Sequence, residues 1–302
     1  MLQSGDNDAE LGNYGIPPIG LGTYRAGGYE CFDAVRAALD MGYRHIDTAM
    51  AYENEAVVGR AIDCSGLDRD EIFLTTKIKG YPRFLDYDSV VEAATGCLDR
   101  LGTSYVDLLL IHWWNSRADM EETFGALAEL VDSGCVERIG VSNFSVDQLQ
   151  RAMDVSAIPI FTNQVEHHPY WRQDEVLSFC QSNDVVLTAY SPLAEGRVVG
   201  DDVLTTIGAE YDKTAAQVAI RWLIQQDHVV TIPKTVRPPR LQENFDVFDF
   251  TLSEAEMTRI DELEAPFWYR HNREGGLVYR ARGVVGPVAE RVVPASVLGK
   301  FT

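Results

Sequence analysis

Lysine is the scarcest charged residue in this chain of 302 residues. The sequence holds 46 acidic residues against 26 basic ones, and only five of the basic residues are lysine while 21 are arginine. The formal net charge of −20 disfavours nucleic acid and anionic membranes as partners, because like charges repel. An acidic surface that avoids lysine indicates a salt-adapted organism, in which salt screens the repulsion between carboxylates. A protein that is merely acidic is the alternative.

Long apolar runs and cysteine motifs are also missing. No run approaches the roughly 18 apolar residues of a membrane-spanning helix. The first residues, MLQSGDNDAELGN, lack the basic and apolar regions of a signal peptide. The five cysteines are scattered and form no CxxC motif, which argues against a disulfide framework or a zinc site. We expect a cytoplasmic protein that binds no membrane, as a monomer or weak homo-oligomer.

Eight short β-rich runs alternate with helical stretches between about residues 19 and 245. They cover residues 19–23, 43–48, 72–78, 106–112, 138–142, 159–165, 185–190 and 228–232. Eight such units favour a TIM (β/α)8 barrel over an open doubly wound sheet. The glycine motif of the open fold is absent, because Arg25 stands where its third glycine belongs after Gly20 and Gly22.

The composition changes near the C-terminal end. Residues 1–265 fit one barrel domain, whereas residues 266–302 hold six basic residues against two acidic ones and show no helical period. We expect this extended tail to lie over the acidic body, at the substrate pocket or at a subunit contact. A loosely ordered terminus is the alternative.

Polar side chains finish one predicted strand after another. In a TIM barrel, catalytic groups lie at the carboxyl ends of the strands and in the loops that follow. Packing alone explains a single such residue, but it does not explain the whole set. The set comprises Asp47, Tyr52, Lys77, His112, Ser142, Asn143, Gln164, Tyr190 and Lys234.

Several stretches, in order and at compatible spacing, resemble the aldo-keto reductase family. They are GLGT at residues 20–23, DTAMAYENE at 47–55, GVSNF at 140–144, NQVEHHP at 163–169 and IPK at 232–234. The resemblance covers roughly residues 15–262. It implies a (β/α)8 barrel that reduces aldehydes or ketones with NADPH.

The resemblance assigns a catalytic tetrad. Tyr52 is the implied proton donor, although a phenol ordinarily titrates near pH ~10. Lys77 is expected to lower the pKa of that phenol, and Asp47 to pair with Lys77. His112 is expected to hydrogen-bond the substrate oxygen and orient the carbonyl.

The same resemblance implies the cofactor site. Lys234, Thr235 and Arg240 would bind a 2′-phosphate through charge-assisted hydrogen bonds, which favours NADP over NAD. A solvated charge cluster is the alternative. Ser142, Asn143 and Gln164 would hold the nicotinamide carboxamide, and Tyr190 would stack on its ring. The remaining cofactor candidates are Gly22, Thr23, Ser191, Leu193, Glu243 and Asn244.

The substrate pocket departs from the family pattern. Lys79 stands where an aromatic residue is usual, and we hypothesise that its charge favours anionic or polyhydroxylated carbonyl substrates. A solvent-facing lysine is the alternative. The other candidate wall residues are Tyr24, Tyr81, Trp113, Trp114, Phe267 and Trp268.

The histidines outside the tetrad are expected to be structural. The pair His167 and His168 lacks metal-type spacing and a second ligand cluster, so we expect no metal. His45, on an apolar strand, is expected to be a core histidine. The rival to an enzyme is a non-catalytic NADPH-binding regulatory subunit of the same fold, against which the intact tetrad argues.

Overall fold

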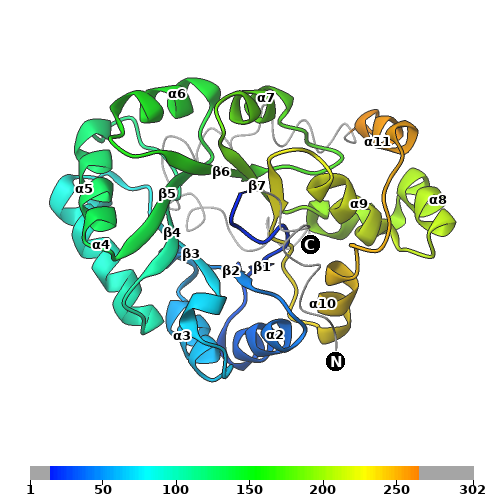
Figure 1. Ribbon diagram of the computed structural model, residues 1–302, viewed down its shortest axis with the longest axis horizontal. Coiled ribbons are helices and arrows are strands. Elements are labelled where there is room, and N and C mark those ends of the chain that lie inside the picture. Colours follow the sequence, from blue (N-terminus) through cyan, green and yellow to red (C-terminus); the bar gives the residue numbers. More distant parts are fainter. Residues whose placement is uncertain (1–13, 265–302) are drawn as a thin grey trace, which may run out of the picture.

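Eight parallel strands run side by side in chain order, with helices on the outside (Figure 1). The computed structural model describes residues 14–264. Each predicted strand is present, although several are shorter than expected. The strands are β1 (Leu21–Gly22), β2 (His45–Asp47), β3 (Phe73–Ile78), β4 (Val106–Ile111), β5 (Val136–Ser142), β6 (Ile160–Glu166), β7 (Val186–Tyr190) and β8 (Val229–Thr231).

The last strand returns to the first. Ile19 and Thr231 form a parallel bridge, and Thr231 N donates a hydrogen bond of 2.8 Å to Pro18 O. Gly20 N donates in turn to Thr231 O at 2.8 Å. The predicted TIM (β/α)8 barrel is therefore confirmed, and the carboxyl ends of its strands meet on one face.

The helices alternate with the strands, as the sequence predicted. Gly102 ends α4, the longest helix of the described residues, in the left-handed conformation with φ of 67°, which glycine adopts without strain. The helices are α2 (Gly28–Asp40), α3 (Glu55–Asp63), α4 (Tyr87–Leu101), α5 (Met120–Asp132), α6 (Val146–Val155), α7 (Asp174–Ser182), α8 (Asp202–Glu210), α9 (Ala215–Ile224), α10 (Pro238–Phe245) and α11 (Glu254–Asp261).

The barrel interior changes from apolar to ionisable along the strands. Leu108 and Leu110 of β4 belong to a buried apolar cluster that also draws on β3, β7 and β8, and His112 follows two residues later. In β3, Thr75 is followed in the same way by Lys77. Because residues two apart on a strand point to the same side, the interior positions next to the carboxyl ends receive the polar side chains.

His45 is a core residue, as expected. It is 1% exposed, its Nε2 lies 3.2 Å from Thr75 Oγ1, and burial lowers its pKa to about 3. The ring fills the space beside Gly20, where a Cβ atom would lie 2.4 Å from His45 Nδ1. Glycine at position 20 therefore leaves room for the neutral imidazole.

The described part of the chain bears on membrane-spanning helices but does not include the tail. Residues 266–302, with the pocket candidates Phe267 and Trp268, lie outside the described residues. Of the helices in residues 14–264, none combines the length and apolar character that crossing a bilayer requires.

Candidate active site

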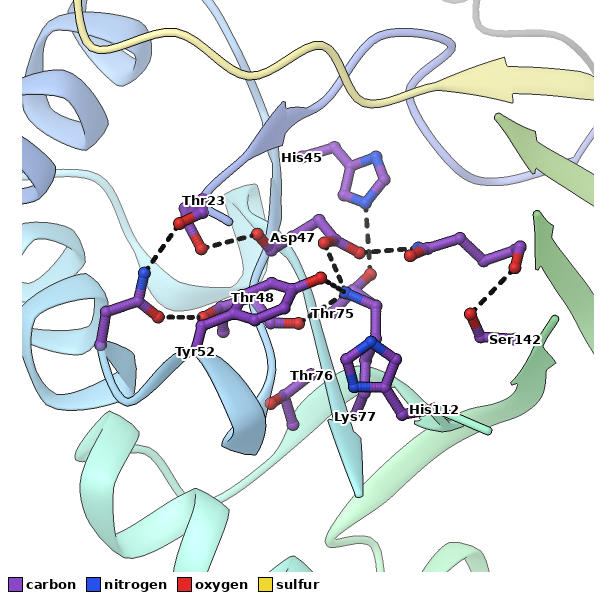
Figure 2. Close-up of polar contacts among 12 residues, drawn as sticks. Thr23, His45, Asp47, Thr48, Tyr52, Thr75, Thr76, Lys77, His112 and Ser142 are labelled. Atoms are coloured by element: carbon purple, nitrogen blue, oxygen red, sulfur yellow. Dashed lines mark hydrogen bonds and ion pairs between the residues drawn. The ribbon is translucent and has the colours of Figure 1, made fainter. Parts of the chain in front are cut away.

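The four tetrad side chains meet at the carboxyl end of the barrel (Figure 2). Asp47 ends β2, Lys77 lies in β3, and His112 follows β4; Tyr52 ends the short 3-10 helix η1 (Met50–Tyr52). Lys77 Nζ donates to Asp47 Oδ1 at 2.5 Å, to Thr48 O at 2.8 Å and to Tyr52 Oη at 3.4 Å. All three ammonium hydrogens therefore have acceptors, which fixes the position of the buried charge.

The expected net lowering of the Tyr52 pKa is wrong for this structure. The pKa of Tyr52 is raised well above its ordinary value, first by burial and then by the negative charge of Asp47. The physical reason is the geometry of the pair. Asp47 lies closer to the ammonium than the phenol does, and it largely cancels the positive charge that Tyr52 would otherwise feel. Tyr52 therefore keeps its proton at neutral pH.

His112 faces the phenol as a neutral ring. Its centroid lies 5.7 Å from that of Tyr52, with the rings edge to face. Burial and, after it, the charges of Lys77 and Lys79 together lower the pKa of His112 to about 3. One ring nitrogen therefore carries a hydrogen and can donate to a carbonyl oxygen at neutral pH.

The residues predicted to hold a carboxamide also lie together. Asn143, in the left-handed region with φ of 62°, donates from Nδ2 to Ser142 Oγ at 2.9 Å and to His112 O at 3.2 Å. Its Oδ1 accepts a hydrogen bond of 2.9 Å from Tyr190 Oη. Ser142 Oγ donates to the carbonyl oxygen of Gln164 at 2.9 Å. The predicted carboxamide site is thus a network whose members bind one another.

Gln164 has a contact that the sequence did not indicate. Its Nε2 donates a hydrogen bond of 2.8 Å to Asp47 Oδ2, and its side chain is buried. The amide nitrogen is thus used by the tetrad. No sequence signal links these residues, which are 117 positions apart.

Known proteins resemble this chain in sequence. Residues 18–265 match the sequence profile of the Aldo/keto reductase family. The chain belongs to this family. An aldo-keto reductase of Mycolicibacterium smegmatis is 43% identical over 250 residues, which cover 82% of this chain and 90% of that protein. Glyoxal reductase of Bacillus subtilis is 40% identical over 249 residues, covering 82% and 89%.

Solved structures agree. The crystal structure of MGS-M4, an aldo-keto reductase from a Medee basin deep-sea metagenome library, has a TM-score of 0.80 and 43% sequence identity. The match covers 83% of this chain and 93% of that one. This chain is therefore an oxidoreductase of the aldo-keto reductase family, whose members generally use NAD(P)H.

The donor set after β8 fits the phosphate of a dinucleotide. Lys234, Arg237 and Arg240 are exposed, and within residues 14–264 none of them forms an ion pair, in a chain rich in carboxylates. They stand where the chain enters α10, whose first two residues, Pro238 and Pro239, carry no N–H group, so the side chains are the donors available to an anion. Thr235 is buried beside them, and its Oγ1 accepts from Arg237 N at 3.2 Å. Arg237 was missed in the sequence analysis.

The structure places the other predicted cofactor residues as follows. A Cβ atom on Gly22 would lie 2.7 Å from Ile232 O, so only glycine lets β1 approach the segment after β8 this closely. Asn244 is buried, and within the described residues its carboxamide makes no hydrogen bond, which leaves it for a ligand. Thr23 donates from Oγ1 to Asp47 O at 3.0 Å, and Ser191 has φ of 52°. Leu193 and Glu243 are half-buried in the loop after β7 and in α10.

The substrate candidates divide between the pocket and the core. The ring of Tyr24, 44% exposed, lies 5.2 Å from that of Tyr52. Trp113 lines a cavity of about 410 Å³ that also touches Asn143, but none of the four tetrad residues lines it. Trp114 instead packs on Phe144 at 6.1 Å, against the core.

The segment after β3 carries the two remaining described candidates. Lys79 is half-buried, and its charge acts on His112, which supports its placement near the pocket. Tyr81 contacts Phe84, with ring centroids 6.3 Å apart. Between them, a Cβ atom on Gly80 would lie 2.0 Å from Trp113 O, so the loops after β3 and β4 touch through their backbones.

The histidine pair after β6 has structural partners. His167 Nδ1 accepts from Gln173 N at 3.1 Å, and its ring stacks on Trp222 at 5.3 Å. His168 Nε2 lies 3.4 Å from Glu166 Oε1. In the part of the chain that the structure describes, no group of three or more His, Cys, Asp or Glu residues could hold a metal ion.

Proposed function

We propose that this protein reduces aldehydes and ketones to alcohols with NADPH, and that Tyr52 is the general acid. The observation that carries the proposal is the arrangement around the ammonium of Lys77, which contacts both Asp47 and Tyr52 at 2.5 and 3.4 Å. A buried cation beside a phenol stabilises the negative charge that forms when the phenol gives up its proton. Packing does not require such an arrangement.

Each side chain has a separate task in this proposal. NADPH, when bound, supplies the hydride that reaches the carbonyl carbon. The Tyr52 hydroxyl gives its proton to the carbonyl oxygen, and Lys77 stabilises the resulting phenolate. The neutral His112 ring donates a hydrogen bond to the same oxygen and orients it. The raised pKa of Tyr52 keeps the proton in place until hydride transfer makes the oxygen basic.

The cofactor and substrate preferences follow from charge. Three exposed cations without carboxylate partners in the described chain support a 2′-phosphate, and hence NADPH over NADH. Lys79 supports anionic or polyhydroxylated carbonyl substrates, because its charge reaches the His112 ring. If Lys79→Trp leaves the preference for acidic over neutral aldehydes unchanged, the substrate part of the proposal is wrong.

The test is NADPH oxidation with a panel of aldehydes, keto acids and sugars, at low and at multimolar KCl. We expect turnover by the wild type and its loss in Tyr52→Phe, with NADPH binding intact. Tyr29→Phe is the matched control, because Tyr29 is 89% exposed. Tight NADPH binding without turnover on any substrate at either salt concentration would instead identify a regulatory subunit. Higher turnover at high salt would support a salt-adapted, cytoplasmic enzyme.

A further inference from the structure

A second buried carboxylate lies behind the Asp47–Lys77 pair. Glu55 is the first residue of α3, three positions after Tyr52, and its side chain is 1% exposed. Its Oε1 accepts a hydrogen bond of 2.6 Å from Thr76 Oγ1 in β3. Because Thr76 directly precedes Lys77, Glu55 joins the segment that carries the phenol to the strand that carries the ammonium.

The cationic partner of Glu55 lies in a different environment. Arg100, in the last turn of α4, donates from Nε to Glu55 Oε2 at 2.7 Å, but its side chain is 41% exposed. Water screens the guanidinium much more than it screens the buried carboxylate. The field that the pair exerts on the barrel interior is therefore negative.

A negative field stabilises the charged form of the buried Lys77 side chain. Its side chain is 0% exposed, and burial lowers its pKa, while the charges of Asp47 and then Glu55 raise it. The positive charge of Lys77 in turn acts on two neighbouring histidines, whose pKa values it lowers. Lys77 contacts Asp47 from β2 and Tyr52 from η1, its charge acts on His45 from β2 and His112 after β4, and the charge of Glu55 from α3 acts on it through space.

We propose that Glu55 is a positioning residue for the reductase site. It fixes the Tyr52 segment against β3 and, together with Asp47, keeps the Lys77 ammonium charged beside the phenol. Only the catalytic consequence of this role rests on the proposed function. The role itself concerns the proton on Lys77, which is measurable without substrate or cofactor.

The scarcity of lysine makes the direct experiment feasible. With five lysines in the chain, a spectrum of protein labelled with ¹³C-lysine contains five side-chain signals. The signal of Lys77 is assigned from Lys77→Arg and followed against pH in the full chain. We expect Glu55→Gln to lower the pH at which Lys77 titrates by about 1 unit, since a charge is removed from its neighbourhood.

Two further variants separate charge from structure. Glu53→Gln is the matched control, because Glu53 is exposed two positions away, and we expect it to leave Lys77 unchanged. Arg100→Gln removes the cation and is expected to move the titration of Lys77 the opposite way, to higher pH. A merely structural contact would not produce shifts of opposite sign. If Glu55→Gln fails to fold, Arg100→Gln alone decides, and a titration at or below the wild-type pH overturns the proposal.

Activity supplies the second measurement. In Glu55→Gln, we expect the alkaline limb of the pH–rate profile to move to lower pH by a similar amount, with NADPH binding unchanged. A Lys77 signal and an alkaline limb that both match the wild type would overturn the role of Glu55. A wild type without turnover would count against the proposed function, while the titration of Lys77 would still decide the role of Glu55.

Discussion

Gln164 of β6 reaches across the barrel to Asp47 of β2, with 2.8 Å between Nε2 and Oδ2. The other oxygen of the carboxylate, Oδ1, lies 2.5 Å from Lys77 Nζ. Both oxygens of Asp47 are therefore held by buried donors from different strands. The residue predicted to bind the nicotinamide carboxamide is at the same time a partner of the Asp47–Lys77 ion pair, so the predicted cofactor site and the proposed proton donor share one hydrogen-bond network.

This link predicts a pH-dependent defect in Gln164→Glu. The introduced carboxyl lies beside Asp47, and two adjacent carboxylates resist ionising together, which raises the pKa of one of them. At low pH the introduced group keeps its proton and donates to Asp47 as the amide does. As pH rises, repulsion replaces the hydrogen bond, so turnover and the free energy of unfolding both fall relative to the wild type.

Gln150→Glu is the control for this substitution. Gln150 Nε2 also donates to a carboxylate, Asp154 Oδ1 at 2.9 Å, but both residues are exposed on α6. Water screens the new charge there, so we expect no pH-dependent difference from the wild type. Equal pH profiles of turnover in Gln164→Glu and Gln150→Glu would rule out the proposed role of the buried link.

Asp47→Asn is predicted to destabilise the protein by about 3–5 kcal/mol, because it leaves the buried charge of Lys77 without its counterion. Asp47 is 1% exposed, so water does not replace the lost interaction. Urea unfolding measures the change. The double variant Asp47→Asn with Lys77→Met removes both charges, and we expect it to recover part of the loss. A double variant less stable than Asp47→Asn would contradict this explanation.

A structural feature could be predicted from the sequence when it depends on residues that are close together in the chain. The positions of Lys77 and His112 at the ends of their strands were predictable, because an apolar run sets the alternation of side chains and the polar residue that ends it inherits the inward direction. The pKa of Tyr52 was not predictable, since it depends first on how deeply the folded barrel buries the phenol and then on the nearby charge of Asp47.

Contacts between distant segments also escaped the sequence. Asn54 and Glu55 belong to a stretch that resembles the family, yet their roles emerged only from their partners. Asn54, 3% exposed, donates from Nδ2 to Thr23 O and Ala26 O at 2.9 Å and so ties the loop after β1 to the Tyr52 segment. The packing of Trp114 against the core also escaped the sequence, because it depends on Phe144, a residue thirty positions later.

Acid sensitivity is predicted from three buried histidines. The pKa is lowered to about 3 in His45 and His112 and to about 4 in His167, chiefly by burial. In the unfolded chain each ring takes up a proton near pH ~6.5, whereas the folded protein keeps it neutral. Stability is therefore present above pH ~6.5 and is lost as the pH falls from there towards the folded values, by about 1.4 kcal/mol per pH unit for each ring.

Urea unfolding between pH 5 and 6, below the unfolded pKa, checks this dependence. We expect His45→Gln to reduce the slope of the free energy of unfolding against pH by the share of one ring, about 1.4 kcal/mol per pH unit. An unchanged slope would show that protonation of His45 does not contribute to the pH dependence of the free energy of unfolding.

The cation cluster predicts cofactor preference. Arg240→Ala is expected to weaken NADPH binding about 10- to 100-fold, the loss typical of a hydrogen bond between charged groups, and to leave NADH binding nearly unchanged. Titration of the protein with each cofactor measures the two affinities. Arg259→Ala is a suitable control, because Arg259 is an exposed arginine on α11. An equal loss for NADPH and NADH would show that Arg240 does not recognise the 2′-phosphate.

The close packing of Gly20 on His45 predicts a clash. In Gly20→Ala the new Cβ would lie 2.4 Å from the imidazole, so the ring or the strand has to move, at a cost of about 1–3 kcal/mol. Gly27→Ala is the matched control, since a Cβ there meets nothing within 4 Å, and we expect a change of less than ~0.5 kcal/mol. Thermal unfolding compares the two. His45→Ala removes the imidazole and so vacates this space. In the Gly20→Ala background, His45→Ala should therefore cost less stability than it does in the wild type. Strictly additive losses would exclude the clash.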